Sequence, residues 1–298
     1  MKRRAVILVI LANIVYGCSF MMTSIAIASS ERALFGLLAA RFLIAFLALA
    51  ALAACGAVRV RYRGKPVWKL LGISLLYPGL YFFSEAMALT QVSSAVVGVV
   101  IGVAPITTAL LTALLFRRRQ SGGQLAFMVL SVAGVAAVNG LDTQGLSPRA
   151  VLFLALALLS FSAYSIGIHS AGREFTSAEI TLFMMFSGMV IFHLLDAVSR
   201  GPLACVRDLA KPSFLLPVLF LGVVTSALSS LALNEGLCRL PPVTVSVLNN
   251  VTSLVAVLCG VFFLGEAVTA RVLAGCGLIL AGCTGYSLLS SDTGQEHP

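Results

Sequence analysis

The chain has 298 residues, of which 59% are hydrophobic and only 10% are charged, and its formal net charge at pH 7 is +9. Soluble proteins carry roughly 25% charged residues, so this composition excludes an ordinary soluble domain. Apolar runs of about 20 residues recur along the whole length, and each is long enough for an α-helix to cross a hydrocarbon core. The sequence therefore predicts an all-α integral membrane protein.

The positive charge lies mainly in the short loops between apolar runs, where the positive-inside rule accounts for it. No basic patch is interleaved with aromatic residues, so we expect no nucleic-acid partner. The seven cysteines show no CxxC spacing and no Cys/His cluster, so we expect no disulfide framework and no metal. The sequence contains no GxSxG, HExxH, P-loop or dinucleotide-binding turn, so we expect neither an enzyme, nor an ATP-driven pump, nor a cofactor.

Ten candidate membrane spans follow one another, most of them joined by short connections. They cover residues 5–28, 33–55, 68–89, 92–116, 123–141, 149–170, 178–198, 213–236, 240–264 and 270–290. The first run follows three basic residues and contains Ala26-Ile27-Ala28, so a cleaved signal peptide is an alternative to a retained helix. The run is longer than the ~7–15 residues of a signal h-region, which favours a retained helix. Residues 291–298 are polar, and we expect a disordered cytoplasmic tail there.

Orientation is predicted from the distribution of Lys and Arg. With the N-terminus in the cytoplasm, most basic residues fall in inner loops and fewer fall in outer loops. This bias predicts cytoplasmic N- and C-termini. As a separate expectation, we place this multi-pass protein in the bacterial inner (plasma) membrane.

The two halves of the chain match each other at an offset of 148 residues. Tyr16 then falls on Tyr164, and the span at 92–116 falls on the span at 240–264. Five spans per half is an odd number, so the second copy must cross the membrane in the opposite orientation. We therefore predict two inverted five-helix repeats, residues 1–146 and 147–290, with a substrate site near the midplane between them.

The two matched spans carry polar or small side chains on corresponding faces. The stripes are Ser94, Gly98, Gly102, Pro105, Thr108 and Thr112 in the first copy, and Pro242, Ser246, Asn249, Asn250, Ser253 and Gly260 in the second. One interpretation is a pair of helices that line a central cavity; another is tight packing through small residues. Packing explains the adjacent Asn249 and Asn250 poorly, because two amides within a membrane span need hydrogen-bond partners. Pro105 is expected to kink its helix.

The sharpest charged feature is in the third span, where Tyr77, Tyr81 and Glu85 share one helical face. A carboxylate within a membrane is a candidate for proton coupling or for binding a substrate amine. Alternatively, Glu85 lies near the outer end of its span and reaches water, or it pairs with Arg41. For Arg41 we expect a structural ion pair or snorkelling toward the interface.

Three further polar residues are candidates for the cavity wall. Tyr16 and Tyr164 occupy matched positions in the first and sixth spans, where either pocket walls or ordinary packing is plausible. Asn234 shares a face with two serines in the eighth span. His169 and His193 have no companions at metal-ligand spacing and are expected to be packing or interfacial residues.

Several segments resemble the EamA-type drug/metabolite transporters. They are "NIVYGCSF" at 13–20, "ARFLIAFLAL" at 40–49, "APITTALLTALLF" at 104–116 and "VFFLGEAVTARVLAGCGLILAGC" at 261–283. The chain departs from the family pattern at Phe116-Arg117-Arg118, where Leu-Gly-Glu is common, and at Ser253, where a proline would recur. Glu266 is interpreted as a helix-end residue.

The resemblance implies a secondary transporter, usually an exporter of amino acids or other small metabolites, without naming the substrate. The expected partners are a small-molecule substrate, the lipid bilayer and a second copy in a homodimer. The alternatives are a membrane-embedded enzyme or lipid-translocating protein at the bilayer interface, and a non-transporting assembly or receptor subunit. The predicted substrate pathway comprises Tyr16, Tyr81, Glu85, Gly102, Pro105, Thr108, Tyr164, Asn234, Ser246, Asn249, Asn250 and Ser253.

Overall fold

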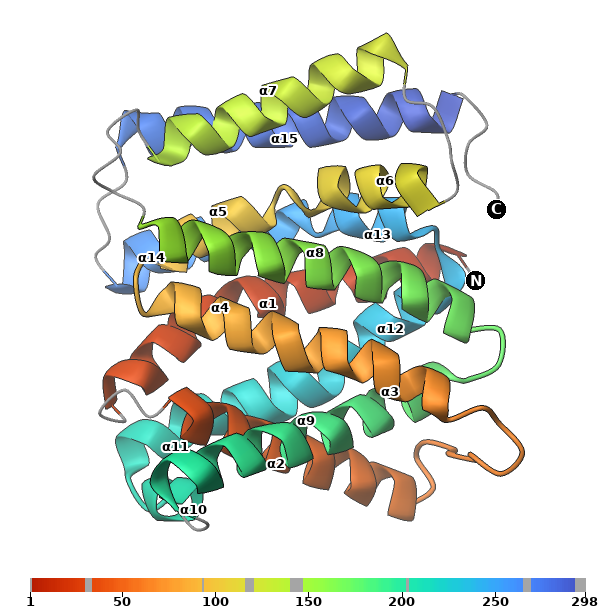
Figure 1. The fold of residues 1–298 in the computed structure, drawn as a ribbon, viewed down its shortest axis with the longest axis vertical. Helices are drawn as coiled ribbons and strands as arrows, with labels where there is room; N and C mark the ends of the chain where they lie inside the picture. The colour runs from red at the N-terminus through yellow and green to blue at the C-terminus, as the bar shows by residue number, and fades with distance from the viewer. Residues whose placement is uncertain are drawn as a thin grey trace.

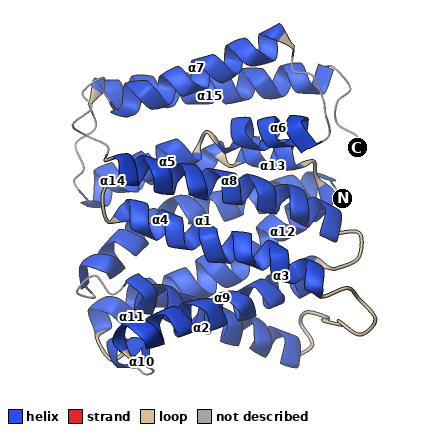
Figure 2. Ribbon diagram, in the orientation of Figure 1, coloured by secondary structure: helices blue, strands red, loops and turns tan. Residues whose placement is uncertain are grey.

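The computed structural model describes residues 2–29, 34–92, 94–115, 121–139, 147–201, 204–264 and 269–292. Every regular element in these ranges is a helix (Figure 2). In chain order they are α1 (Lys2–Ser29), α2 (Leu34–Ala54), α3 (Trp68–Ser74), η1 (Leu75–Leu80), α4 (Tyr81–Leu89), α5 (Ser94–Ile101), α6 (Ala104–Leu115), α7 (Gly122–Asn139), α8 (Pro148–Ala171), α9 (Ser177–Arg200), α10 (Ala204–Asp208), α11 (Pro212–Leu219), η2 (Phe220–Ser229), α12 (Ser230–Arg239), α13 (Pro242–Leu248), α14 (Asn250–Leu264) and α15 (Ala270–Asp292).

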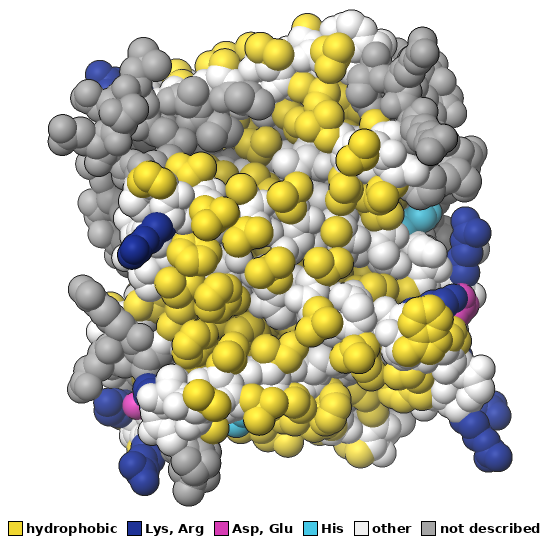
Figure 3. Space-filling model, viewed as in Figure 1, with side chains coloured by type: hydrophobic (Ala, Val, Ile, Leu, Met, Phe, Trp, Pro, Cys, Tyr) yellow, Lys and Arg dark blue, Asp and Glu magenta, His cyan; other side chains and the backbone are white. Residues whose placement is uncertain are grey.

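Several of these helices are long and apolar enough to cross a membrane. Among the described residues, seven candidate spans meet both criteria, and three shorter apolar helices cover 104–115, 122–131 and 273–286. Figure 3 shows one face of the molecule, where hydrophobic side chains cover the middle and basic side chains lie at the two ends of the helices. The prediction of an all-helical, multi-pass membrane protein is confirmed.

The helices lie side by side, and successive long helices run in alternating directions (Figure 1). We call the end at which α1 begins and α15 finishes the termini end, and the other the opposite end. The first helix, α1, lies inside the bundle and packs along α14, α12 and η2. Helix α2 packs against α9 and η2, whereas α7 and α15 form a pair at one side that packs mainly against itself.

The fourth apolar segment is not the single helix predicted over 92–116. Helix α5 ends at Ile101, and α6 begins at Ala104. Pro105 is the second residue of α6, a position where its missing N–H costs no helical hydrogen bond. The expected kink is therefore a full interruption, at Gly102 and Val103.

The ninth apolar segment, predicted as one helix over 240–264, is interrupted as well. Helix α13 ends at Leu248 and α14 begins at Asn250, with Asn249 between them. The N–H of Thr252 donates to the carbonyl of Asn249 at 2.9 Å, three residues back instead of four. Helix α5 packs on α14 and α6 packs on α13, so the two interrupted segments lie antiparallel (Figure 1).

The third and eighth segments both contain a π-helical stretch. In η1 the backbone of Tyr77 has φ −143° and ψ 112°, which is not helical. The residue before a proline is disfavoured in the α region, and Pro78 follows directly. Residues 223–228, which lie 148 after η1, fall within η2, so the irregularity recurs at the matched position. π-Helical turns of this kind occur often at functional sites.

Glycines bring the backbones of α7 and α15 together. A Cβ on Gly134 would lie 2.8 Å from the carbonyl oxygen of Gly275, and one on Gly282 would lie 2.7 Å from the carbonyl oxygen of Phe127. Gly134 and Gly282 are themselves 148 residues apart. The two helices thus cross through small residues, as membrane helices commonly do.

Some sequence predictions concern positions at or beyond the edges of these ranges. The expected tail at 291–298 begins two residues too early, because α15 continues to Asp292. Residues 293–298, Glu266 and the junction at 146 lie outside the described residues.

Candidate functional site

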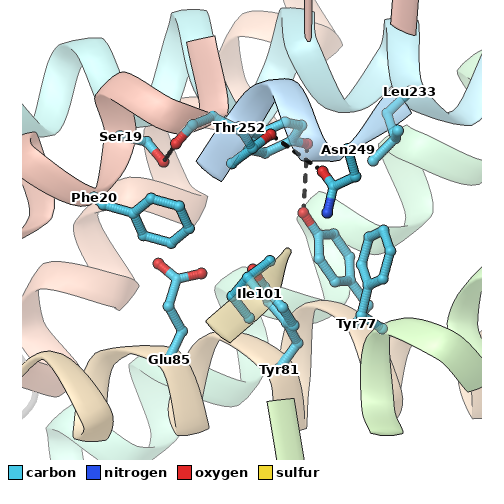
Figure 4. A pocket seen from close by; sticks show the side chains of 11 residues that line it. Ser19, Phe20, Tyr77, Tyr81, Glu85, Ile101, Leu233, Asn249 and Thr252 are labelled. Carbon is cyan, nitrogen blue, oxygen red and sulfur yellow. Dashed lines mark hydrogen bonds between the residues drawn. The ribbon is translucent and has the colours of Figure 1, made fainter. Parts of the chain in front are cut away.

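A cavity lies among α1, η1, α4, α5, α8, α12 and the α13–α14 junction (Figure 4). Its empty volume, counted up to its open side, is about 320 Å³. It is lined by Tyr16, Ser19, Phe20, Tyr77, Tyr81, Glu85, Ile101, Phe161, Leu233, Asn249 and Thr252. Aromatic and apolar walls with a few polar groups are typical of sites for small molecules.

Glu85 supplies the single ionisable carboxyl group of this lining. Its side chain projects into the cavity from α4 (Figure 4), and only 3% of the residue is exposed. It interacts electrostatically with Arg41 and with the hydroxyl of Tyr81. Within the described ranges neither Glu85 nor Arg41 belongs to an ion pair with N–O ≤ 4.0 Å. The predicted alternatives of reaching outer water or forming a direct ion pair with Arg41 therefore do not describe this carboxyl.

Stacked tyrosines form the wall on the termini side of Glu85. The rings of Tyr77 and Tyr164 lie 4.4 Å apart at an angle of 19°. The Tyr77 hydroxyl donates to the Tyr16 hydroxyl at 3.4 Å, and the latter is hydrogen-bonded to the Ser230 hydroxyl at 2.7 Å. The non-helical backbone at Tyr77 thus positions a ring between the matched tyrosines of the two halves.

A buried amide supports this wall from behind. The Tyr164 hydroxyl donates to the Oδ1 of Asn234, which is fully buried. The Nδ2 of Asn234 donates to Oγ1 of Thr181 at 2.8 Å. Asn234 therefore fixes the orientation of Tyr164 but does not itself line the cavity.

The amide at the interruption of the ninth segment lies on the facing wall. The Thr252 hydroxyl lies 3.1 Å from Oδ1 of Asn249 and 3.2 Å from Oδ1 of Asn13. The Nδ2 of Asn13 is buried and has no hydrogen-bond partner. This side of the cavity offers neutral hydrogen-bonding groups opposite the carboxyl of Glu85.

The polar contact between α6 and α13 lies beside the cavity. Thr108 Oγ1 is 3.0 Å from Ser246 Oγ and 3.1 Å from Ser162 Oγ on α8. These hydroxyls hold the two interrupted segments and α8 together. The three hydroxyls thus serve one another as hydrogen-bond partners.

Four of the predicted pathway residues line the cavity, namely Tyr16, Tyr81, Glu85 and Asn249. The other eight are not lining residues: Gly102, Pro105, Thr108, Tyr164, Asn234, Ser246, Asn250 and Ser253. All eight are buried. The transport role of all twelve stays a prediction.

The sequence prediction omitted seven lining residues: Ser19, Phe20, Tyr77, Ile101, Phe161, Leu233 and Thr252. The repeat offset could have identified two of them. Leu233 lies 148 residues after Glu85, and Asn249 lies 148 after Ile101, so both members of each matched pair face the same cavity. Tyr77 could have been added from its place one turn before Tyr81.

The histidines lie in ordinary packing contacts. Nδ1 of His169 is 3.0 Å from the carbonyl of Leu237, and Nδ1 of His193 is 2.9 Å from the carbonyl of Met189. In the part of the chain that the structure describes, no group of three or more His, Cys, Asp or Glu side chains could hold a metal ion.

Known proteins are similar to this chain in sequence and in fold. An uncharacterized transporter of Bacillus subtilis (strain 168), YcxC, is 32% identical over 291 residues, which cover 95% of this chain and 93% of that protein. Protein PecM of Dickeya dadantii (strain 3937) is 25% identical over 211 residues, 70% of each chain. A solved crystal structure has a similar fold, with a TM-score of 0.66 and 21% identity over 93% of this chain and 98% of its own.

The profile of the EamA-like transporter family matches the chain twice, over residues 3–140 and over residues 148–288. These two matches together cover nearly the whole sequence. The chain therefore belongs to the EamA-like transporter family.

Proposed function

We propose that this protein is a secondary active transporter that exports amino acids or similar small metabolites across the bacterial inner membrane by alternating access. Membership in a transporter family supports transport as such. One observation of the site carries the rest of the proposal. A buried carboxyl, Glu85, projects into a central cavity whose walls come from both halves of the chain.

The proposed topology has ten spans in two inverted halves, with both termini in the cytoplasm. The double match of the family profile supports two halves. The pairs Glu85/Leu233 and Ile101/Asn249, each related by the offset of 148, face one cavity and support an axis of pseudo-symmetry there. A site on such an axis is the place where alternating access can expose a substrate to each side in turn.

The proposed substrate class follows from the chemistry of the cavity walls. The carboxylate of Glu85 suits the ammonium group of an amino acid, and Tyr81 and Asn249 offer neutral hydrogen bonds. Phe20 and Phe161 provide apolar walls for a side chain.

Proton coupling through Glu85 completes the proposal. An ionised carboxylate without a contacting cation is costly inside a membrane protein. A bound proton or a bound ammonium would each remove that cost, and the two would compete for the same oxygens. Exchange of one for the other would let the proton gradient drive export.

The test is efflux of radiolabelled amino acids from proteoliposomes that hold the purified protein and an imposed pH gradient. We expect Glu85→Gln to lose gradient-driven efflux. Glu174→Gln makes the same change in a partly exposed ion pair at the termini end, and it should transport like the wild type. Unchanged pH dependence in Glu85→Gln would remove proton coupling, and absence of efflux from folded wild-type protein would remove the amino-acid assignment.

A further inference from the structure

A second charged residue lies buried next to the cavity without lining it. Arg41 on α2 is only 1% exposed. Its Nε donates to Ser226 Oγ on η2 at 2.7 Å, and its guanidinium carbon is 4.3 Å from the centre of the Phe82 ring. Its buried Nη2 has no hydrogen-bond partner. Burial of such a charge costs desolvation free energy, so we expect a nearby group of opposite charge that offsets this cost.

The position of Arg41 relates it to Glu85. Phe82, which stacks under the guanidinium, lies on α4 one turn before Glu85. Arg41 interacts electrostatically with Glu85 and with the hydroxyls of Tyr81 and Tyr16. No ion pair within 4.0 Å joins Arg41 to Glu85 in the described residues, so the carboxyl keeps its oxygens free of direct contact with the guanidinium.

The second half has no equivalent of this charge arrangement. The residues 148 after Arg41 and Glu85 are Met189 and Leu233, both uncharged. The titratable groups that face Glu85 are therefore Arg41 from α2, Tyr16 from α1 and Tyr81 from its own helix. Of these, Arg41 alone carries a charge at neutral pH.

We infer that Arg41 is the resident counter-charge of Glu85: it offsets the carboxylate after the proton has left and before the substrate's ammonium arrives. This inference rests on the proposed function, because it concerns the step between proton release and substrate binding. The hydrogen bond to Ser226 and the stacking on Phe82 hold the guanidinium close enough to act through its field. They also hold it too far away to occupy the carboxylate in place of a substrate.

The first test is the pH profile of efflux in proteoliposomes. Removal of a nearby opposite charge typically moves the ionisation of a carboxyl by about one unit or more, so Arg41→Gln should shift the half-maximal pH upward by about that amount. Arg41→Lys, which keeps the charge, should stay close to the wild type. Arg149→Gln removes an exposed cation at the opposite end and should leave the profile unchanged. Reduced efflux of Arg41→Gln with an unmoved midpoint would overturn the inference.

The second test does not require transport. Thermal unfolding of purified Arg41→Gln, Glu85→Gln and the double variant forms a double-mutant cycle. Each single variant leaves one buried charge uncompensated and should melt at a lower temperature, whereas the double variant should melt higher than the sum of the two losses predicts. Even where Arg41→Gln alone does not fold, the double variant should. Additive losses would overturn the inference, whereas coupling without any efflux would overturn only the proposed function.

Discussion

At the scale of single residues, the cavity depends on side chains that do not line it. Asn234 is the clearest case, because its amide joins the Tyr164 hydroxyl to Thr181. Tyr164 in turn stacks on Tyr77, which does line the cavity. The geometry of the wall is thus set two side chains away from the space where a substrate would bind.

Removal of the Asn234 amide should therefore destabilise the protein. In Asn234→Ala the buried Tyr164 hydroxyl loses its acceptor, whereas the Thr181 hydroxyl keeps its hydrogen bond to the carbonyl of Ser177 at 2.6 Å. An unsatisfied buried group costs about 1–3 kcal/mol of unfolding free energy. Unfolding of the purified protein in detergent, followed by heat or denaturant, measures this loss. Tyr164→Phe removes the orphaned hydroxyl itself, so the double variant should lose less than the two single variants combined. Strict additivity would show that the contact carries no coupling.

A second prediction at this scale concerns Tyr62, in the loop between α2 and α3. Its hydroxyl donates to the carbonyl of Glu179 at 2.7 Å, and burial raises the pKa of Tyr62 to about 12. Because the pKa of Tyr62 in the folded protein lies above the ordinary tyrosine value of 10, this contact contributes its full stabilisation of the fold below pH 10. That stabilisation is lost as the pH rises toward 12. The ultraviolet difference titration between wild type and Tyr62→Phe should show a single phenol that ionises near pH 12. A difference centred near pH 10 would contradict the partly buried position of this ring.

At the scale of elements, the glycines of α7 and α15 set how closely these helices approach. An added methyl group at Gly282 would lie 2.7 Å from the Phe127 carbonyl oxygen, whereas at Gly277 of the same helix it would meet nothing within 4 Å. Gly282→Ala should therefore lower the melting temperature. Gly277→Ala should raise it slightly, because alanine favours a helix by about 1 kcal/mol over glycine. A shift of the same sign in both variants would contradict the close crossing at Gly282.

The positions of the helices could be predicted from the sequence, and their interruptions only in part. Apolar length locates a membrane helix well, because the hydrocarbon core dictates it. Pro105 signals an interruption, since a proline lacks the N–H that a helix interior needs. Asn249 gives no such signal, because its effect depends on Thr252 and on the partner helix.

The unpredicted interruption at Asn249 also explains why some site residues were missed. A stripe drawn at about 100° per residue assumes an unbroken helix. The interruption at Asn249 breaks that regular stripe. Asn249 and Thr252 line the cavity, whereas Asn250 and Ser253 are buried without lining it. Helix α4 is regular, and there the prediction that Tyr81 and Glu85 share one helical face agrees with the structure, where both line the cavity.

At the scale of the whole molecule, the repeat divides the chemistry unequally between its halves. Corresponding positions line the same cavity, yet the position that matches the carboxyl of Glu85 is Leu233, and the position that matches the amide of Asn249 is Ile101. The first half thus supplies the charge and the second half supplies the neutral amide. A pseudo-symmetric scaffold can rock between two related states while its binding groups remain asymmetric.

Such a cycle requires the two ends of the bundle to face opposite sides of the membrane, and two exposed positions allow a direct test. Cys55 is exposed at the termini end, and Gln91 is exposed at the opposite end. In a variant whose only cysteine is Cys55, an impermeant maleimide should label inverted vesicles but not intact cells. With Gln91→Cys as the only cysteine, the reagent should label intact cells instead.

The expected pattern follows from the loop between α2 and α3, where Arg59, Arg61, Arg63 and Lys65 gather at the termini end. The positive-inside rule places such a loop in the cytoplasm. Reversed labelling would invert the proposed orientation and with it the direction of export, while leaving the central site in place. Labelling of both positions from one side would contradict the fold itself, because an odd number of crossings separates the two residues.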